Sequence, residues 1–281
     1  MARRPFASLA GLAIATLIVV AQRASAQNFP QHTLHSVAAI IAEKAAQKST
    51  VGNAFFVEVP SKAFPGRSFV YLVTARHNLF DLQGRRYTKL WVALEDSATG
   101  ANREDPLPDE SHWILDPNRE SADLAAIPLN PRNANIAPVP ISATFAELSE
   151  ARVGALPATV DVGADSYYLT AAELGDRKTR LVALAHFGRV SVAEAALATI
   201  PGAGSQALYF VDTAGSAEAS GAPVFVRAED RYLLWGMMEA EPEASGNDDS
   251  ALDGLSGVLP ASYIAETVEA MAAVQERKSK R

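Results

Sequence analysis

The sequence predicts an all-β protein built in two halves and closed by a C-terminal helix. Short segments rich in β-branched and aromatic residues recur along the chain, and glycine, proline and polar residues separate them. This pattern is typical of a β-barrel or β-sandwich rather than of alternating βαβ units. Residues 130–140 hold three prolines and no regular apolar period, so we expect the chain to cross there from the first half to the second.

The first half is expected to follow an amphipathic helix over residues 36–48, within a lead-in of residues 27–50. Four apolar residues fall there at helical spacing, and they are Val37, Ile40, Ile41 and Ala45. Beyond this segment the apolar period changes to that of strands. Strands are predicted at residues 51–59, 69–74, 90–94, 113–115 and 124–129.

The second half repeats the pattern of short strands and turns. Strands are predicted at residues 159–162, 166–170, 179–185, 189–192, 207–211, 224–226 and 232–238. Residues 261–275 then change to a helical period, with Ile264, Val268 and Met271 on one face. A basic tail, residues 276–281, is expected after this helix.

The N-terminus has the pattern of a secretory signal peptide. Arg3 and Arg4 give a positive start, residues 9–20 are apolar but too short to span a bilayer comfortably, and residues 24–26 form an Ala-Ser-Ala cleavage site. We therefore expect residues 1–26 to be removed and the protein to be periplasmic or secreted. The two arginines fit either the general secretory route or the twin-arginine route.

Composition limits the kind of partner this protein can have. The chain has 281 residues, a formal net charge of −7 and no cysteine. An acidic surface disfavours nucleic acid, because phosphate binding needs a basic face. No second membrane segment follows the signal peptide, so no membrane association is expected after cleavage. Without disulfides, an exported protein must be stabilised by a hydrophobic core, and a chain of this length can bury one.

Residues 210–226 (FVDTAGSAEASGAPVFV) place a run of small residues between two apolar segments. Glycine, alanine, serine and proline between strands indicate a tight turn with unusual backbone angles. A serine in such a turn is well placed to react. Ser220 is therefore either an ordinary turn residue or a nucleophile, and a base and an acid elsewhere in the chain would decide between these interpretations.

His77 is the best candidate for the base. It directly follows the apolar strand predicted at residues 69–74, which places its imidazole at the rim where a strand gives way to a loop. The other histidines suit other roles: His32 and His35 precede the β domain, His112 lies in a polar loop, and His186 ends a strand of the second half.

Asp123 is the best candidate for an acid that orients the base. It stands at the start of an apolar strand, where burial of a carboxylate is costly unless it is hydrogen-bonded. An imidazole N–H meets that need and fixes the tautomer in which the other ring nitrogen can take a proton from a hydroxyl. The alternative role for Asp123 is that of a strand cap.

In these three motifs the chain resembles bacterial trypsin-like serine proteases of the chymotrypsin fold. The matching stretches are Thr74-Ala75-Arg76-His77, Asp123-Leu124-Ala125 and Ser220-Gly221-Ala222-Pro223. Supporting matches are residues 52–55 (Gly-Asn-Ala-Phe), Asp212 and the terminal helix. The resemblance covers residues 51–273, and three motifs in one order are far more specific than any of them alone.

The resemblance implies two six-stranded antiparallel β-barrels, at about residues 51–130 and 141–260, with the active site in the cleft between them. It implies that Ser220 attacks a carbonyl, that His77 takes and returns its proton, and that Asp123 holds the imidazole. The backbone N–H groups of Glu218 and Ser220 would bind the oxyanion. No metal or cofactor is implied.

The chain departs from the family pattern just before the serine. Glu218 stands where glycine is usual, and Ala219 where aspartate or asparagine is usual. A residue with a Cβ reaches the glycine's backbone angles only at a cost of about 1 kcal/mol or more. Two alternatives to a serine endopeptidase therefore stay open: a catalytically silent fold that binds proteins, and an esterase that uses the same triad.

Substrate selection is expected to lie in the loops. Ala214 lacks the pocket charge of trypsins, and Met238 and Glu239 end a strand that resembles the pocket-lining segment, so these three residues are pocket candidates. Residues 239–254 hold six acids and no base, which indicates a solvated loop, attraction of cationic substrates or weak calcium binding. The expected partner is a polypeptide substrate, and the expected state is a monomer.

Overall fold

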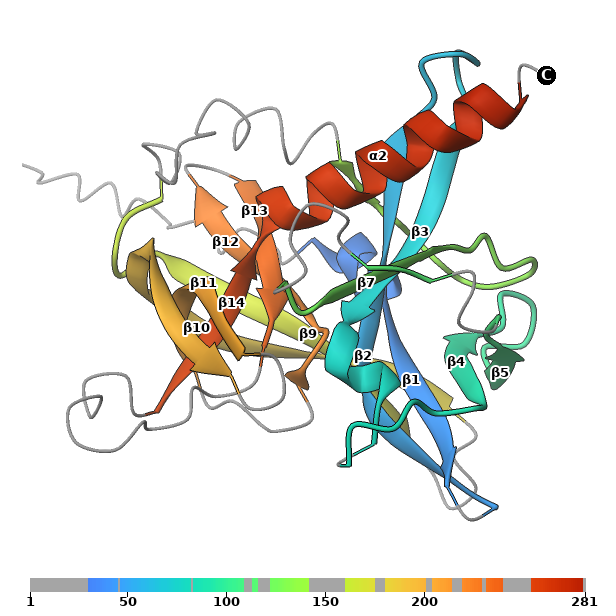
Figure 1. Ribbon diagram of the computed structural model, residues 1–281, viewed down its shortest axis with the longest axis horizontal. Coiled ribbons are helices and arrows are strands. Elements are labelled where there is room, and N and C mark those ends of the chain that lie inside the picture. Colours follow the sequence, from blue (N-terminus) through green and yellow to red (C-terminus); the bar gives the residue numbers. More distant parts are fainter. Residues whose placement is uncertain are drawn as a thin grey trace, which may run out of the picture.

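Two β units and one long helix make up the structure (Figure 1). The computed structural model describes residues 30–44, 46–81, 83–108, 113–115, 122–141, 160–174, 180–200, 204–213, 219–228, 231–239 and 254–279. The predicted all-β fold in two halves with a C-terminal helix is confirmed. The expected signal peptide lies outside the described residues.

The first unit is an eight-stranded sheet with the order β5-β4-β1-β2-β3-β7-β6, and β8 pairs in parallel with β2. Its strands are β1 (Val37–Lys44), β2 (Gln47–Pro60), β3 (Ser68–Ala75), β4 (Leu90–Glu95), β5 (Asn102–Pro106), β6 (Ile114–Leu115), β7 (Leu124–Pro128) and β8 (Val139–Pro140). The strand count exceeds the expected six because β1, β5 and β8 join the five predicted strands. β5 is an edge strand of the sheet and has the polar sequence NREDP, so its residues show no alternation of apolar and polar side chains.

The helix predicted over residues 36–48 is wrong. A short 3-10 helix, η1 (Gln31–Ser36), leads instead into β1, which lies between β2 and β4. Every residue from position 37 to position 42 is buried. A strand that is covered on both faces needs no polar alternation, so its apolar residues also fit a helical period.

The second unit is a closed six-stranded barrel with the order β10-β11-β14-β13-β12-β9. Its strands are β9 (Asp165–Leu174), β10 (Arg180–Ile200), β11 (Gly204–Asp212), β12 (Pro223–Ala228), β13 (Arg231–Met238) and β14 (Leu255–Pro260). Two predicted strands, 179–185 and 189–192, form one long strand, β10, whose pairing with β11 is irregular near Val192. The strand predicted at 159–162 is absent from its described part, residues 160–162, and β14 was not predicted.

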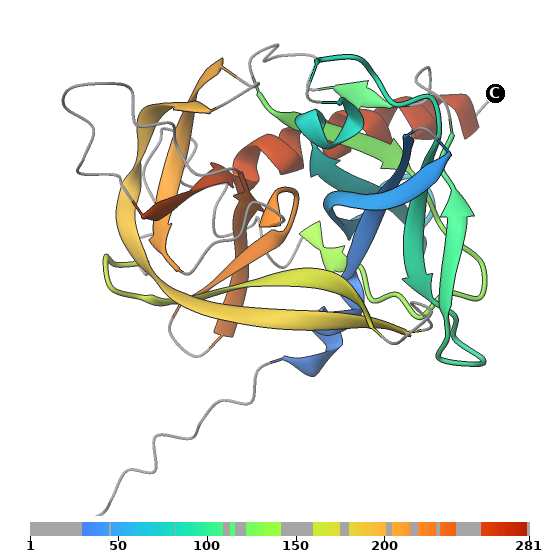
Figure 2. The same cartoon turned by 90° about the horizontal axis from the view of Figure 1, so that it is seen from below.

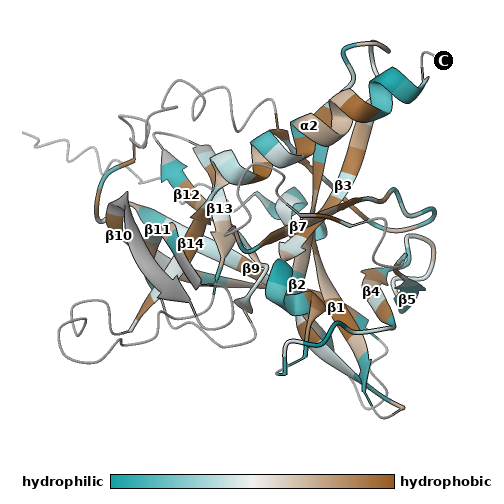
Figure 3. Ribbon diagram, in the orientation of Figure 1, coloured by the Kyte–Doolittle hydropathy of each residue, from teal (hydrophilic) through white to brown (hydrophobic). Residues whose placement is uncertain are grey.

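The two units share one hydrophobic core. A single cluster of buried residues joins Phe55 and Tyr71 of the first sheet to Tyr167 and Phe225 of the barrel and to Ile264 of the helix. In Figure 3, apolar residues run along β1, β3 and the middle of the helix, whereas the helix's last turn is hydrophilic. Burial of these large side chains is worth about 1.5–3 kcal/mol each, so this cluster holds the two units together.

Helix α2 (Ala261–Ser279) crosses from the barrel to the first sheet, as Figures 1 and 2 show. It is longer than predicted and includes part of the expected basic tail. The Tyr71 hydroxyl donates to Gln275 Oε1 at 2.8 Å. Glu276 Oε1 accepts three hydrogen bonds from the loop after β2, from Ser61 Oγ at 3.0 Å, Lys62 N–H at 2.5 Å and Ala63 N–H at 3.2 Å.

We expect Glu276→Ala to lower the free energy of unfolding by about 1 kcal/mol, because three donors lose their shared acceptor. Glu269→Ala is the matched control, since Glu269 is an exposed glutamate of the same helix. It should change stability by less than about 0.5 kcal/mol. Urea unfolding measures both variants, and equal losses would contradict this role for Glu276.

Candidate active site

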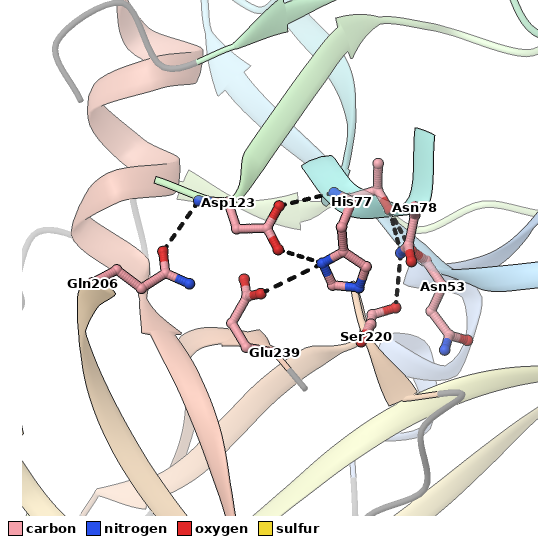
Figure 4. A network of polar contacts seen from close by, with 8 residues as sticks. Asn53, His77, Asn78, Asp123, Gln206, Ser220 and Glu239 are labelled. Atoms are coloured by element: carbon pink, nitrogen blue, oxygen red, sulfur yellow. Dashed lines mark hydrogen bonds and ion pairs between the residues drawn. The ribbon is translucent and has the colours of Figure 1, made fainter. Parts of the chain in front are cut away.

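His77 and Asp123 meet at one end of the paired strands β3 and β7 of the first sheet. The 3-10 helix η2 (Arg76–Leu79) follows β3 directly, Asp123 directly precedes β7, and β3 pairs with β7. The Asp123 carboxylate accepts a hydrogen bond from the His77 ring at Nδ1, and its Oδ1 accepts the His77 backbone N–H at 2.8 Å (Figure 4). Imidazole and carboxylate are therefore held by both side-chain and main-chain contacts.

Asp123 is buried, with 2% of its side chain exposed. Burial alone would raise its pKa. The hydrogen bond and charge of His77, a hydrogen bond with Glu239 and the His77 backbone N–H outweigh burial and hold the pKa of Asp123 below its ordinary range. The carboxylate is thus ionised at neutral pH, and it fixes the tautomer with a proton on Nδ1, which leaves His77 Nε2 as the acceptor.

Ser220 lies in the turn before β12 and is attached to the first sheet through its carbonyl oxygen. That oxygen accepts the backbone N–H of Asn53 at 2.8 Å and Asn78 Nδ2 at 3.1 Å. Asn78 is the neighbour of His77 in η2. In Figure 4, Ser220 lies on the side of the imidazole away from Asp123. The sequence-predicted residues His77, Asp123 and Ser220 are therefore brought to one place.

Gly221 allows the close approach of this turn to the first sheet. Its φ is +84°, and a Cβ at this position would lie 2.1 Å from the Asn53 carbonyl oxygen and 2.8 Å from Thr74 Oγ1. Thr74 Oγ1 in turn donates to that Asn53 oxygen at 2.6 Å. A side chain would therefore displace the turn from the sheet as well as strain its backbone.

We expect Gly221→Ala to cost more than about 2 kcal/mol of unfolding free energy, because left-handed strain adds to the contact with Asn53. Gly66→Ala is the matched control: Gly66 has a φ of +78°, but no atom lies within 4 Å of its added Cβ. It should cost only about 1–2 kcal/mol. Thermal unfolding compares the two variants, and equal losses would contradict the steric part of the argument.

Asn53 is a positioning residue that the sequence analysis did not identify. Its backbone N–H binds the Ser220 carbonyl, and its Oδ1 accepts the Ala171 N–H of the barrel at 2.8 Å. One residue of the first sheet thus fixes two segments of the second unit. The available signal was an asparagine inside the apolar stretch of residues 51–59, where a buried amide needs partners.

Glu239 follows β13 and lies beside the His77–Asp123 pair. None of its side chain is exposed, its Oε2 lies 4.0 Å from His77 Nδ1, and its N–H donates to the Gly257 carbonyl at 2.9 Å. Neither carboxyl oxygen accepts a hydrogen bond from a donor in the described part of the chain. Burial, the Asp123 charge and a hydrogen bond to Asp123 raise the pKa of Glu239 well above its ordinary range.

The expected pocket residues are placed differently from one another. Glu239 has the buried position just described, with no side-chain surface for a substrate to contact. Met238 is also buried, and its backbone binds the turn that holds Ser220: its carbonyl accepts the Gly221 N–H at 2.9 Å, and its N–H donates to the Ala222 carbonyl at 2.7 Å. Ala214, Glu218 and the remainder of the acidic stretch, residues 240–253, lie outside the described residues.

Three other histidines are described, and they do not join this group. His186 Nε2 lies 2.9 Å from Thr170 Oγ1 on β9, its ring stacks on Tyr168, and burial lowers its pKa. His35 lies 3.5 Å from Glu95 in the first unit. His32 is exposed in η1, and His112 lies outside the described residues.

The polar group around His77 is compact. Within the described ranges, one ligand atom each of His77, Asp123 and Glu239 lies within 4.8 Å of the others. Because His77 Nδ1 is already bound to Asp123, we assign no metal to this group. Among the helices that the structure describes, none is long and apolar enough to cross a membrane.

The solved structures that this chain resembles include HtrA-type proteases and the Rv3671c protease. One solved structure that it resembles is the HtrA-type protease AlgW with a decapeptide, at 16% identity and a TM-score of 0.49, with 88% of this chain and 66% of that chain covered. In AlgW with a tripeptide the identity is 17% and the TM-score 0.48, with 86% of this chain and 62% of that chain covered.

A second protein with a similar structure is the Rv3671c protease from M. tuberculosis in its active form. The identity is 16% and the TM-score 0.46, and the match covers 83% of this chain and 79% of that chain. No protein-family model matches the sequence, and no curated protein matches it. The chain spans about two thirds or less of the length of the AlgW chains.

Proposed function

We propose that this protein is an exported serine endopeptidase that hydrolyses polypeptides through His77, Asp123 and Ser220. The observation that carries the proposal is the buried, ionised Asp123 that holds the imidazole by Nδ1, beside a serine whose turn is attached to the neighbouring Asn78. An imidazole held in this way keeps Nε2 as the acceptor, which is what the activation of a serine hydroxyl requires of its base.

The proposed reaction begins when Ser220 Oγ attacks the carbonyl carbon of the substrate. His77 Nε2 takes the hydroxyl proton, and Asp123 stabilises the imidazolium that forms. The imidazolium then gives the proton to the leaving amine, which departs as the acyl-enzyme forms. A water molecule, deprotonated by His77, hydrolyses the acyl-enzyme and releases the product acid.

The oxyanion needs main-chain donors beside Ser220. Within the turn, the Gly221 N–H donates to Met238 and the Ala222 N–H donates to the Ala219 carbonyl. These two groups are already used, so we assign the oxyanion to the N–H groups of Ser220 and Glu218. We further propose a periplasmic or secreted location and a monomeric state.

One observation favours a different function. Ser220 is only 3% exposed, which suits a catalytically silent fold that binds polypeptides without cleaving them. An esterase would use the same three residues on small acyl groups. Labelling and substrate profiles separate these functions.

A fluorophosphonate probe is expected to label the wild-type protein and to fail on Ser220→Ala and His77→Ala, because only an activated serine reacts with it. Ser68→Ala is the matched control, since Ser68 is exposed on β3, and it should keep the label. A folded wild type without label would favour the silent binding module. Label retained on Ser220→Ala would identify a different serine.

Asp123→Asn is expected to lower kcat by about 10⁴-fold, because the amide no longer selects the tautomer with the proton on Nδ1. Cleavage of a fluorogenic peptide library measures the loss and reveals the preferred residues. A variant with at least a tenth of the wild-type kcat would contradict the role of Asp123. Turnover of small esters without cleavage of any peptide would favour the esterase.

A further inference from the structure

We propose that Glu239 is a positioning residue for His77 and Asp123. Its neutral carboxyl donates a hydrogen bond to Asp123, and Asp123 in turn holds the imidazole. The inference rests on the proposed function because it concerns the same His77–Asp123 pair. It adds a fourth group to the proposed triad, supplied by the residue that follows the barrel strand β13.

The surroundings of the Glu239 carboxyl leave it one hydrogen-bond partner among the described residues. Its carboxyl is completely buried, and no donor in the described residues bonds to either oxygen. The Asp123 carboxylate lies beside both Glu239 and His77, and it is itself an acceptor. Two buried carboxylates repel each other, whereas one proton between them turns the repulsion into a hydrogen bond.

Within the described part of the chain, the titratable groups that face Glu239 are His77 on η2 and Asp123 before β7. From β14, Gly257 contributes only a main-chain carbonyl. From β11, Gln206 Oε1 accepts the Asp123 N–H at 3.1 Å and does not titrate. The high pKa of Glu239 agrees with this environment.

The proton on Glu239 matters for the base. With Glu239 neutral, Asp123 is the single anion that faces the imidazole among the described residues. With Glu239 ionised, two anions would face the ring, and both would favour its protonated form. A protonated His77 cannot accept the serine proton. Glu239 therefore supports Asp123 only while it keeps its own proton.

Infrared spectroscopy tests the proton directly and needs no enzyme activity. The folded protein at pH 7 should show the carbonyl band of a neutral carboxylic acid, and Glu239→Gln should lack it. The same comparison in the Ser220→Ala background should give the same result. No band in the wild type would overturn the proposal. A band that appears only after dialysis against EDTA would also overturn it, because a cation would then have occupied the proton's place.

Kinetics test the positioning role. Glu239→Gln keeps a neutral donor, so we expect kcat within about threefold of wild type and an unchanged midpoint for the acid limb of the pH–rate profile. Glu239→Ala removes the donor and should lose tenfold or more. A Gln variant as impaired as the Ala variant, or a Gln variant whose acid limb shifts, would overturn the proposal. If no variant reacts with the fluorophosphonate probe, the proposed function fails while the infrared result still decides this one.

Stability should depend on pH in a direction fixed by the raised pKa. Below about pH 4, glutamate is protonated in both the folded and the unfolded chain, so Glu239→Gln and wild type should have similar Tm values. As the pH rises to 8, the unfolded chain releases this proton and the folded chain holds it, which lowers wild-type stability. The Tm of Glu239→Gln should therefore exceed that of wild type increasingly with pH, and Glu269→Gln should show no such trend. A constant difference would overturn the proposal.

Discussion

Two hydrogen bonds to the carbonyl oxygen of Ser220 set the geometry on which the candidate site depends. The donors, the Asn53 N–H and the Asn78 amide, belong to the first β unit, whereas Ser220 belongs to the turn before β12 of the second. Asn78 also adjoins His77, so Ser220 is attached to the element that carries the proposed base. A displacement of about 1 Å between such groups can cost a hundredfold in rate, and contacts this close to the chemistry leave little room for it.

The same region explains why small residues surround the serine. Gly221 approaches the Asn53 carbonyl too closely for any side chain. Its N–H and the Ala222 carbonyl bind Met238 at the end of β13, and the next residue, Glu239, lies near His77 Nδ1. The turn is therefore bonded to the first sheet on one side and to its own barrel on the other. Hydrogen bonds therefore connect the turn that holds Ser220 to both units of the structure.

Much of the fold could be predicted from the sequence because most strands alternate or end at clear turns. The failures have physical causes. β1 is covered on both faces, so its unbroken run of apolar residues matched a helical period. β5 is short, polar and at the sheet edge, where pairing through the main chain suffices. Only tertiary pairing identifies such segments.

Some residues of the candidate site could likewise be predicted from the sequence, and others could not. His77, Asp123 and Ser220 could be found because each stands where an apolar strand meets a turn, and each has a residue type that chemistry requires. Asn53 acts largely through its backbone, which a side-chain pattern does not reveal. Glu239 begins an acidic run that suggests a solvated loop. Its burial depends on the pairing of β13 with β14, a strand that the sequence analysis did not detect.

The contacts of helix α2 limit the order in which the protein can fold during synthesis. Its Gln275 and Glu276 satisfy groups on β3 and on the loop after β2, which leave the ribosome some two hundred positions earlier. Until α2 arrives, the first sheet lacks these partners and the apolar side chains that α2 buries. A nascent chain can therefore pair His77 with Asp123 before α2 has been made, but it completes the shared core only with α2. In a protein proposed to cut polypeptides, this order delays the finished enzyme until α2 has been made.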